Sequence, residues 1–394
     1  MKFIDLEAQQ ARIKKSIEER VRVVLAHGQY VNGPEVSELE VRLASYVGNR
    51  NAVGCSSGTD ALLMALMAYG VGPGDAVFTT PFTFVATAEV IRLLGAVPVF
   101  VDIDPKTFNL DPGKLETAIR AVLANDPALH PLPLISNRLS LKARGVIAVD
   151  LFGLPADYDR INPIARNHGL FVIEDAAQSF GAQYNGRKSC SLADIGCTSF
   201  FPAKPLGCYG DGGMCFTDDD KLADILRSIR VHGMGEDRYD NVRIGINGRL
   251  DTLQAAILLA KFEIFPEEVE LRQEKAMAYG DLISSGLSPN PIFSMQHIPA
   301  GSRSAWAQYS ILAADEQNRE TVLNALKEEN IPTAIYYPKP LHLQTAFAFV
   351  GQRKGDFPIS EDYASRIFSV PMHPYLSSAN QAHIVEVIRR CCGS

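Results

Sequence analysis

Apolar and polar positions between residues 50 and 230 alternate between two patterns. Short apolar runs rich in Val, Ile and Phe predict buried strands, and the longer amphipathic stretches between them predict helices. The predicted strands cover residues 51–55, 76–80, 97–101, 145–150 and 170–174, and the predicted helices cover residues 56–69, 83–94, 111–123 and 158–168. This alternation favours an α/β fold built on a mainly parallel sheet.

The flanking regions carry different patterns. Before residue 50, helices are predicted at about 7–27 and at 35–47. After residue 250, a long helical stretch at 251–282 is interrupted near Pro266, and short strands (309–312, 333–337) and helices (320–329, 380–390) follow. We therefore expect a large domain over residues 1–265 and a small C-terminal α/β domain over residues 266–394. Residues 124–144 hold three prolines and no clean period, and we interpret them as a loop-like insertion in the large domain.

Composition and charge narrow the possible partners. The chain of 394 residues is 46% hydrophobic and 21% charged, which predicts a packed core. A net charge of -7 argues against nucleic acid as the main partner. No apolar run approaches the ~18 residues of a membrane span, and the N-terminus has no signal-peptide pattern. The seven cysteines include no CxxC pair and the eight histidines show no ligand spacing, so we expect no disulfide framework and no metal site in a cytoplasmic protein.

The most unusual local pattern is Ser199-Phe-Phe-Pro-Ala-Lys204-Pro-Leu-Gly-Cys-Tyr-Gly-Asp-Gly-Gly213. Each proline fixes its own backbone and restricts the residue before it, so Lys204 is held outside a helix. The glycines that follow allow tight turns and close approach of the backbone. They do not form a dinucleotide-binding loop, because a strand-like run rather than a helix comes next. A lysine enclosed in this way favours a functional role over a solvated surface position.

Two further positions gain meaning from the predicted sheet. Ligands bind at the carboxyl ends of strands in open α/β sheets, and Asp175 follows a predicted strand at such an end. Taken alone, Asp175 is best interpreted as an ordinary helix cap. The functional interpretation is a buried carboxylate that contacts a ligand, and Gln178 could reach the same ligand.

The turn Gly54-Cys-Ser56-Ser-Gly58 has three interpretations. It matches the G-x-S-x-G pattern of serine hydrolases, it could bind a phosphate at the amides of Gly58, Thr59 and Asp60, or it could be a plain serine-capped helix. The hydrolase match is weak because no oxyanion-loop glycine run lies among the residues that precede it.

The motifs resemble a known family when they are read in chain order. They are Ser-Gly-Thr-Asp-Ala-Leu (57–62), Phe-Thr-Phe-Val-Ala-Thr (82–87), Val-Asp-Ile-Asp-Pro (101–105), Glu-Asp-Ala-Ala-Gln-Ser (174–179), the Lys204 loop, Gly-Ile-Asn-Gly-Arg-Leu-Asp-Thr-Leu-Gln-Ala-Ala (245–256), Tyr-Pro-Lys-Pro-Leu-His (337–342) and Pro-Met-His-Pro-Tyr (371–375). Together they resemble the DegT/DnrJ/StrS sugar aminotransferases. The resemblance implies an aspartate-aminotransferase-like fold (fold type I) and the cofactor pyridoxal 5′-phosphate.

The resemblance also implies roles for single residues. Lys204 would bind the cofactor aldehyde covalently and later carry a proton between substrate and cofactor. Asp175 would pair with the pyridine nitrogen and keep it protonated, so that the ring can accept electrons. Gln178 would contact the ring hydroxyl, and Phe84 would stack on the ring face.

The cofactor phosphate would lie at the other end of the Lys204 loop. Ser199 and the amides of Gly58 and Thr59 would hold it, so the spacing from Ser199 to Lys204 would span the cofactor. Asn247 would reach the phosphate from a second subunit, and the active unit would be a homodimer. The glycines after Lys204 would leave room for the substrate.

The implied reaction has two halves. Glutamate would donate its amine, and a keto group on a nucleotide-linked sugar would accept it. The sequence of the Lys204 loop is most similar to that of the subgroup that aminates the 3-keto group of a UDP-2-acetamido-2-deoxy-hexuronic acid in lipopolysaccharide O-antigen assembly. Arg243 is the candidate for the sugar carboxylate, since a planar guanidinium suits it, and an ordinary surface ion pair is the alternative. Tyr336 and His342 are further sugar-binding candidates.

Three alternatives stay open at this point. The substrate could be a dTDP-3-keto-6-deoxyhexose, the protein could be a non-catalytic regulator on the same scaffold, or Ser56 could serve a hydrolase.

Overall fold

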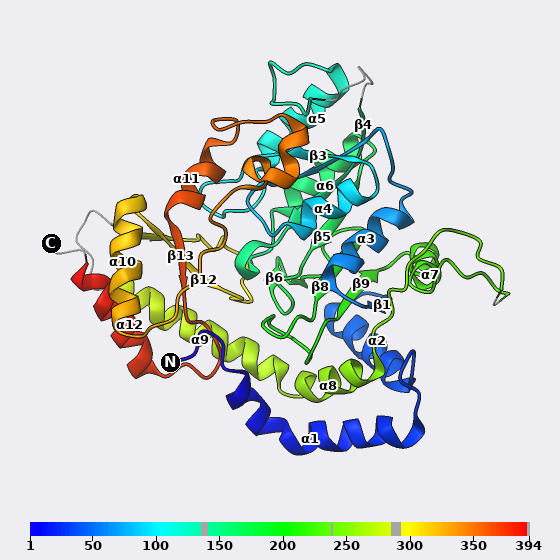
Figure 1. Ribbon diagram of the computed structural model, residues 1–394, viewed down its shortest axis with the longest axis horizontal. Coiled ribbons are helices and arrows are strands. Elements are labelled where there is room, and N and C mark those ends of the chain that lie inside the picture. The colour runs from blue at the N-terminus through cyan, green and yellow to red at the C-terminus, as the bar shows by residue number, and fades with distance from the viewer. Residues whose placement is uncertain (135–140, 238, 285–292, 392–394) are drawn as a thin grey trace.

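A seven-stranded sheet forms the centre of the larger part of this computed structural model, which describes residues 1–134, 141–237, 239–284 and 293–391 (Figure 1). Its strands, in spatial order, are β1 (Asn51–Cys55), β9 (Gly213–Thr217), β8 (Ile195–Ser199), β5 (Phe171–Asp175), β4 (Lys142–Val149), β2 (Asp75–Thr79) and β3 (Val97–Phe100). Strand β9 is antiparallel to both neighbours, and the other neighbouring pairs are parallel. The predicted α/β fold with a mainly parallel sheet is confirmed.

Helices cover both faces of this sheet, because side chains alternate between the faces along each strand. On β4, Ile147 shares a buried cluster with residues of α3 (Gly58–Ala68), α4 (Ala86–Leu93) and α7 (Asp220–Ile229). Its neighbours Val146 and Ala148 belong to a cluster with α5 (Pro112–Ala124) and α6 (Tyr158–Asn167) on the other face. Helices α2 (Pro34–Val47) and α8 (Thr252–Phe262) continue this second layer.

A smaller lobe is built from the C-terminal part of the chain, drawn in yellow to red in Figure 1. Its antiparallel sheet orders β10 (Phe293–Met295), β12 (Tyr309–Ala313) and β13 (Ile367–Val370). The lobe also contains α9 (Phe265–Ser284), α10 (Glu316–Glu328), α11 (Pro358–Arg366) and α12 (Ser378–Arg390), whereas the short 3-10 helices η2 (Leu341–Leu343) and η3 (Thr345–Val350) share a buried cluster with Ala88 of α4 and Phe100 of β3 in the larger part. The core of the lobe begins at Ala276 within α9, and the domain division at residues 265/266 stays a prediction.

Smaller elements connect these parts. A 3-10 turn, η1 (Leu151–Gly153), follows β4, and a minor antiparallel sheet joins β11 (Ser302–Arg303) to β6 (Gln183–Tyr184) and β7 (Arg187–Lys188). The N-terminal helix α1 (Leu6–His27) runs beside α8 (Figure 1). Within the described ranges, no helix is long and apolar enough to cross a membrane.

Several predicted boundaries differ from the structure, and three of the differences concern the site or the insertion. The strand expected at residues 333–337 is a loop with one isolated bridge, Ala334 to Ser369. The helix expected from Thr83 begins three residues later, at Ala86, so Thr83 and Phe84 are free to line a cavity. The insertion expected at 124–144 ends sooner, since β4 already starts at Lys142; within it, residues 135–140 lie outside the described part of the chain.

Candidate active site

A cavity of about 640 Å³ opens at the carboxyl ends of β5 and β8, between the large sheet and the segment 335–337. Its size falls within the ~300–1,000 Å³ typical of small-molecule sites. Eight of the residues proposed from the sequence line it: Gly58, Thr59, Phe84, Asp175, Gln178, Ser199, Lys204 and Tyr336. The fold therefore brings together positions that are as much as 278 residues apart in the sequence, from Gly58 to Tyr336.

The N-terminus of α3 forms one end of the cavity. The Ser57 hydroxyl accepts a hydrogen bond from the Asp60 amide at 3.0 Å, whereas the amides of Gly58 and Thr59 belong to the first helical turn and have no acceptor within the helix. Ser199 packs directly on Gly58, where a Cβ atom would lie 2.6 Å from the Ser199 Cβ. Glycine thus allows a hydroxyl and two helix amides to meet in an arrangement suited to a phosphate.

The Lys204 loop follows β8 and is folded tightly upon itself. The Lys204 amide donates to the Phe201 carbonyl at 2.9 Å, and the Cys208 amide donates to the Phe200 carbonyl at 2.7 Å. A Cβ on Gly207 would lie 2.6 Å from the Phe201 carbonyl oxygen, and one on Gly213 would overlap the backbone of Ser57.

The two glycines Gly210 and Gly212 are packed by side chains instead. Added Cβ atoms there would lie 3.1 Å from Gln254 Nε2 and 3.0 Å from Leu250 Cδ1, respectively. The expectation that the glycines leave room for the substrate is therefore wrong: they let protein atoms pack closely behind the lysine, which immobilises the loop.

The Lys204 side chain lies in a desolvated part of the cavity. Burial lowers the pKa of its amine, and the nearby Asp175 carboxylate partly opposes that shift. Because only a neutral amine can attack a carbonyl carbon, a lowered pKa increases the reactive fraction of Lys204 at neutral pH.

Asp175 ends β5 with its carboxylate held from two sides. Thr87 donates its hydroxyl to Oδ2 at 2.8 Å, and the Ala177 amide donates to Oδ1 at 3.2 Å. Burial raises the pKa of Asp175, while these two hydrogen bonds and Lys204 act in the opposite direction. A buried carboxylate that still faces a cavity can stabilise a cationic group placed there.

Gln178 and two aromatic residues form a further wall. The Gln178 Oε1 accepts from the Phe152 amide at 2.7 Å, and its Nε2 donates to the Tyr337 hydroxyl at 3.0 Å. The Tyr337 ring centroid is 6.4 Å from that of Phe84. Phe84 remains 53% exposed although it is apolar, so its ring face is available to a planar ligand.

Sequence reasoning missed Thr87 and Tyr337. Both lie inside the quoted motifs, but neither has a charge or a metal-binding group that would single it out. Thr87 lies on α4, four residues after Thr83, which precedes the helix, and their hydroxyls are 3.1 Å apart. That four-residue spacing of two threonines was the available signal.

Three other predicted residues lie outside the cavity lining. Arg243 and Asn247 are exposed on the loop that follows α7. The His342 side chain is completely buried, its Nε2 lies 3.0 Å from Glu361 Oε1, and its ring packs on Phe357. A contact between His342 and a sugar would require exposure of this ring.

The remaining sequence alternatives find little support. The Ser56 hydroxyl contacts the Asp60 carboxylate, and Ser56 does not line the cavity. In the part of the chain that the structure describes, no group of three or more His, Cys, Asp or Glu side chains could hold a metal ion.

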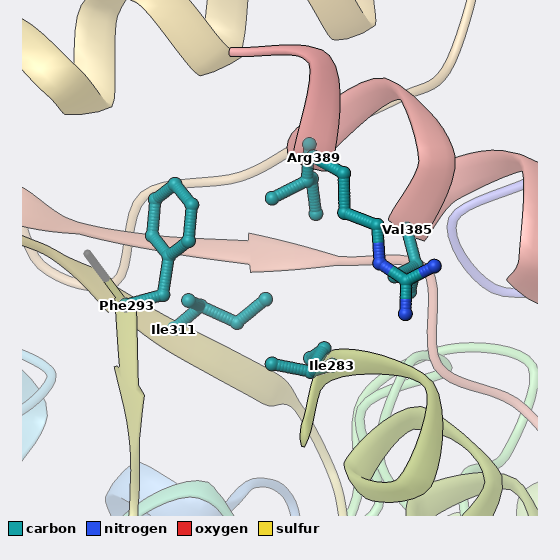
Figure 2. A pocket seen from close by; sticks show the side chains of 6 residues that line it. Ile283, Phe293, Ile311, Val385 and Arg389 are labelled. Carbon is teal, nitrogen blue, oxygen red and sulfur yellow. The ribbon is translucent and has the colours of Figure 1, made fainter. Parts of the chain in front are cut away.

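A second cavity, in the small lobe, has a different character. Figure 2 shows Ile283, Phe293, Ile311, Val385 and the stem of Arg389 around a space of about 10 Å³. Such a space holds one water molecule at most, so it is a gap in core packing and no substrate site.

Comparison with known proteins agrees with this geometry. A model of the DegT/DnrJ/EryC1/StrS aminotransferase family matches residues 11–389. The chain is 49% identical over 380 residues to the UDP-2-acetamido-2-deoxy-3-oxo-D-glucuronate aminotransferase of Pseudomonas aeruginosa, covering 96% of this chain and 97% of that protein.

Solved structures give the same result. A DegT/DnrJ/EryC1/StrS aminotransferase from Brucella abortus is 49% identical, superposes with a TM-score of 0.92 and covers 100% of both chains. A Bacillus subtilis protein solved with bound cofactor PMP is 26% identical, with a TM-score of 0.87 over 100% of this chain and 85% of its own. The chain therefore belongs to the DegT/DnrJ/EryC1/StrS aminotransferase family.

Proposed function

We propose that this protein is a pyridoxal-phosphate-dependent aminotransferase that aminates the 3-keto group of a UDP-linked 2-acetamido-2-deoxy-3-oxo-hexuronic acid. One observation carries the proposal: Lys204 and the buried Asp175 share a cavity with the open N-terminus of α3. The Pseudomonas aeruginosa relative supports the choice of sugar. The product would serve lipopolysaccharide O-antigen assembly.

The residues of the cavity fit the cofactor. The amides of Gly58 and Thr59 with the Ser199 hydroxyl would hold its phosphate, at the place where glycine permits their close approach. Asp175 would hold a proton on the ring nitrogen, and the exposed face of Phe84 would cover the ring. When bound, the cofactor supplies an aldehyde that accepts amines and a ring that withdraws electrons from the reacting carbon.

Gln178 and Lys204 complete the arrangement. Gln178 is oriented by the Phe152 amide and directs its Nε2 toward Tyr337, on the wall where the ring hydroxyl would lie. The Lys204 amine would bind the aldehyde and, once released, would carry a proton from the carbon of the amine donor to the aldehyde carbon of the cofactor; with the acceptor it would carry a proton in the reverse direction, to the carbon that receives the amine. Its lowered pKa suits both tasks, since a neutral amine can bond to carbon and accept a proton.

Glutamate as donor and a homodimer as the active unit are parts of the same proposal. Arg243 and Asn247 lie on an exposed loop outside this chain's cavity, so they would act on the cavity of a second subunit. The same loop exposes Tyr239 and Ile244, at 88% and 85%. Large exposed side chains of this kind are typical of a surface that another chain covers.

The first experiment is half-reaction spectroscopy. Glutamate should shift the absorbance of the loaded cofactor, and a UDP-linked 3-keto-hexuronic acid should restore it faster than dTDP-3-keto-6-deoxyhexoses do. Preference for a dTDP sugar would replace the substrate named here. A cofactor that reacts with glutamate but that no keto sugar restores would support the regulator interpretation.

The second experiment locates the covalent link. Borohydride reduction followed by peptide mass spectrometry should place the cofactor on Lys204. Lys261 is the internal control, because it is a completely buried lysine whose pKa desolvation lowers to about 8, yet it lies outside the cavity lining. Reduction that modifies Lys261 and spares Lys204 would overturn the proposal.

A further inference from the structure

The start of the chain contributes to the cavity. Ile4 lines it, although the next cavity-lining residue along the chain is Ser57. Ile4 belongs to the segment Met1–Asp5, which precedes α1 and is called the N-terminal strap below. Its side chain is half-buried.

The strap is fastened at both ends. The Phe3 carbonyl accepts a hydrogen bond from the Met372 amide at 3.3 Å, and the Phe3 ring centroid lies 6.5 Å from that of Tyr336, which also lines the cavity. At its other end, the Asp5 carboxylate caps α1 by accepting from the Ala8 amide at 3.1 Å. Ile4 is therefore held between two fixed points.

The strap is anchored to the small lobe by the motif Pro371-Met-His-Pro-Tyr375. The proposed function assigns no role to this motif. None of the described residues of this motif lines the cavity. The Tyr375 hydroxyl contacts the Glu268 carboxylate, which also accepts from Gln9 Nε2 of α1 at 2.8 and 3.0 Å. The motif thus ties the N-terminal residues to α9 and the small lobe.

The chemistry of Ile4 indicates which ligand it contacts. An isoleucine side chain cannot hold a phosphate or a ring nitrogen, and the proposed function assigns these groups to Ser199 and Asp175. Ile4 instead adds apolar surface to a cavity that Ile335 and Tyr336 also line. Such surface favours a methyl group or the carbon face of a sugar ring.

From this geometry we infer that the strap is part of the acceptor site and that Ile4 is a specificity-determining contact for the acetamido methyl of the nucleotide sugar. The inference rests on the proposed function. The two half-reactions share the cofactor and the residues that hold it, but they use different substrates. A residue that contacts only the acceptor sugar therefore affects one half-reaction and leaves the other unchanged.

The substitution Ile4→Ala should affect the keto-sugar half-reaction and spare the glutamate half-reaction. We expect kcat/KM for the keto sugar to fall about tenfold, the usual cost of lost apolar contact in a substrate pocket. The glutamate half-reaction should stay within about twofold of the original. Leu25→Ala, which trims a 58% exposed side chain near the far end of α1, is the matched control and should change neither half.

Binding provides a readout independent of turnover. UDP-N-acetylglucosamine, which carries the acetamido group but no keto group to react, should bind the cofactor-loaded Ile4→Ala protein about tenfold more weakly by calorimetry. It should also increase the protection of amides 3–6 from hydrogen exchange in the unaltered protein. Unchanged affinity, or equal losses in both half-reactions, would show that the strap is only structural.

The inference and the proposed function can fail separately. If glutamate does not convert the cofactor in the unaltered protein, the aminotransferase proposal itself fails. If it does, while Ile4→Ala uses the keto sugar normally, only the strap inference is overturned.

Discussion

Glu174 and Asp175 are consecutive buried acids on β5 that face opposite sides of the sheet and opposite surroundings. The Glu174 carboxylate accepts from the amides of Cys190 at 2.6 Å and Leu192 at 2.9 Å, and the charge of the nearby Asp150 carboxylate acts on it. The Asp175 carboxylate accepts from Thr87 and Ala177 and faces the cavity with Lys204.

Burial alone therefore does not identify a functional acid. Desolvation raises the pKa of both carboxyls. Around Glu174 the protein supplies every partner, and burial raises the pKa of its neighbour Asp150 to about 7, so the pair retains a proton that two exposed acids would release. Asp175 has an open side, and that access makes it available to a ligand.

The largest expected effect comes from removing the Lys204 amine, which shares the cavity with Asp175. Lys204→Ala should lower turnover by on the order of 10⁴-fold or more, as for other covalent catalysts, while the protein remains folded and holds the cofactor without a covalent bond. Steady-state rates and the cofactor absorbance after gel filtration measure these outcomes. Normal turnover would remove Lys204 from the proposed role.

The next effect comes from neutralising the acid that faces the cavity. Asp175→Asn should reduce kcat by about 10²–10³-fold, the usual scale for losing one preorganised charge interaction. The melting temperature should change little, because the substitution removes a buried charge and keeps the shape. Rates and thermal denaturation, measured on one preparation, test both statements, and a full rate would contradict the pairing with the ring nitrogen.

Neutralising Glu174, whose partners are all protein groups, should change the stability of the protein and leave its turnover rate unaffected. The raised pKa values of Glu174 and Asp150 mean that the folded state binds a proton that the unfolded state, with pKa values of about 4, releases. The free energy of unfolding should therefore fall as pH rises from about 4 through about 7, by at most about 1.4 kcal/mol per pH unit for one proton.

Glu174→Gln removes one titrating partner, so this pH dependence should become shallower. Chemical unfolding midpoints between pH 5 and pH 8 measure the slope, and Glu116→Gln, at an exposed position on α5, is the matched control. A slope equal to that of the unaltered protein would show that the pair does not retain a proton.

The smallest expected effect comes from removing one hydrogen-bond donor to Asp175, the carboxylate that faces the cavity. Thr87→Val keeps the shape of the side chain and removes the hydroxyl that donates to Asp175. The loss of one hydrogen bond to a charged group costs about 1.5 kcal/mol, so kcat should fall about tenfold, and the pKa of Asp175 should rise further. The absorbance of the bound cofactor, followed against pH, would report that shift; an unchanged profile would assign Thr87 a packing role only.

Much of the fold could be predicted from local pattern. The helices at 7–27 and 35–47, the buried strands and the N-cap at Asp111 all match the structure, since periodicity and capping depend on neighbouring residues. The strand predicted at 333–337 was wrong because an apolar run with aromatic residues suits a strand and a cavity wall equally. Tyr336 and Tyr337 serve as a wall there.

The apolar periodicity, the loop that encloses Lys204 and the motifs that resemble a family of aminotransferases can all be recognised in the sequence. The packing of distant elements alone shows that Thr87 supports Asp175, that the glycines near Lys204 pack against protein, and that Ile4 lines the same cavity as Tyr336. The physical reason is that apolar periodicity is a local property of the chain. A contact between residues hundreds of positions apart depends instead on how completed helices and strands pack, and Ile4 has no chemical feature that reveals its partner in advance.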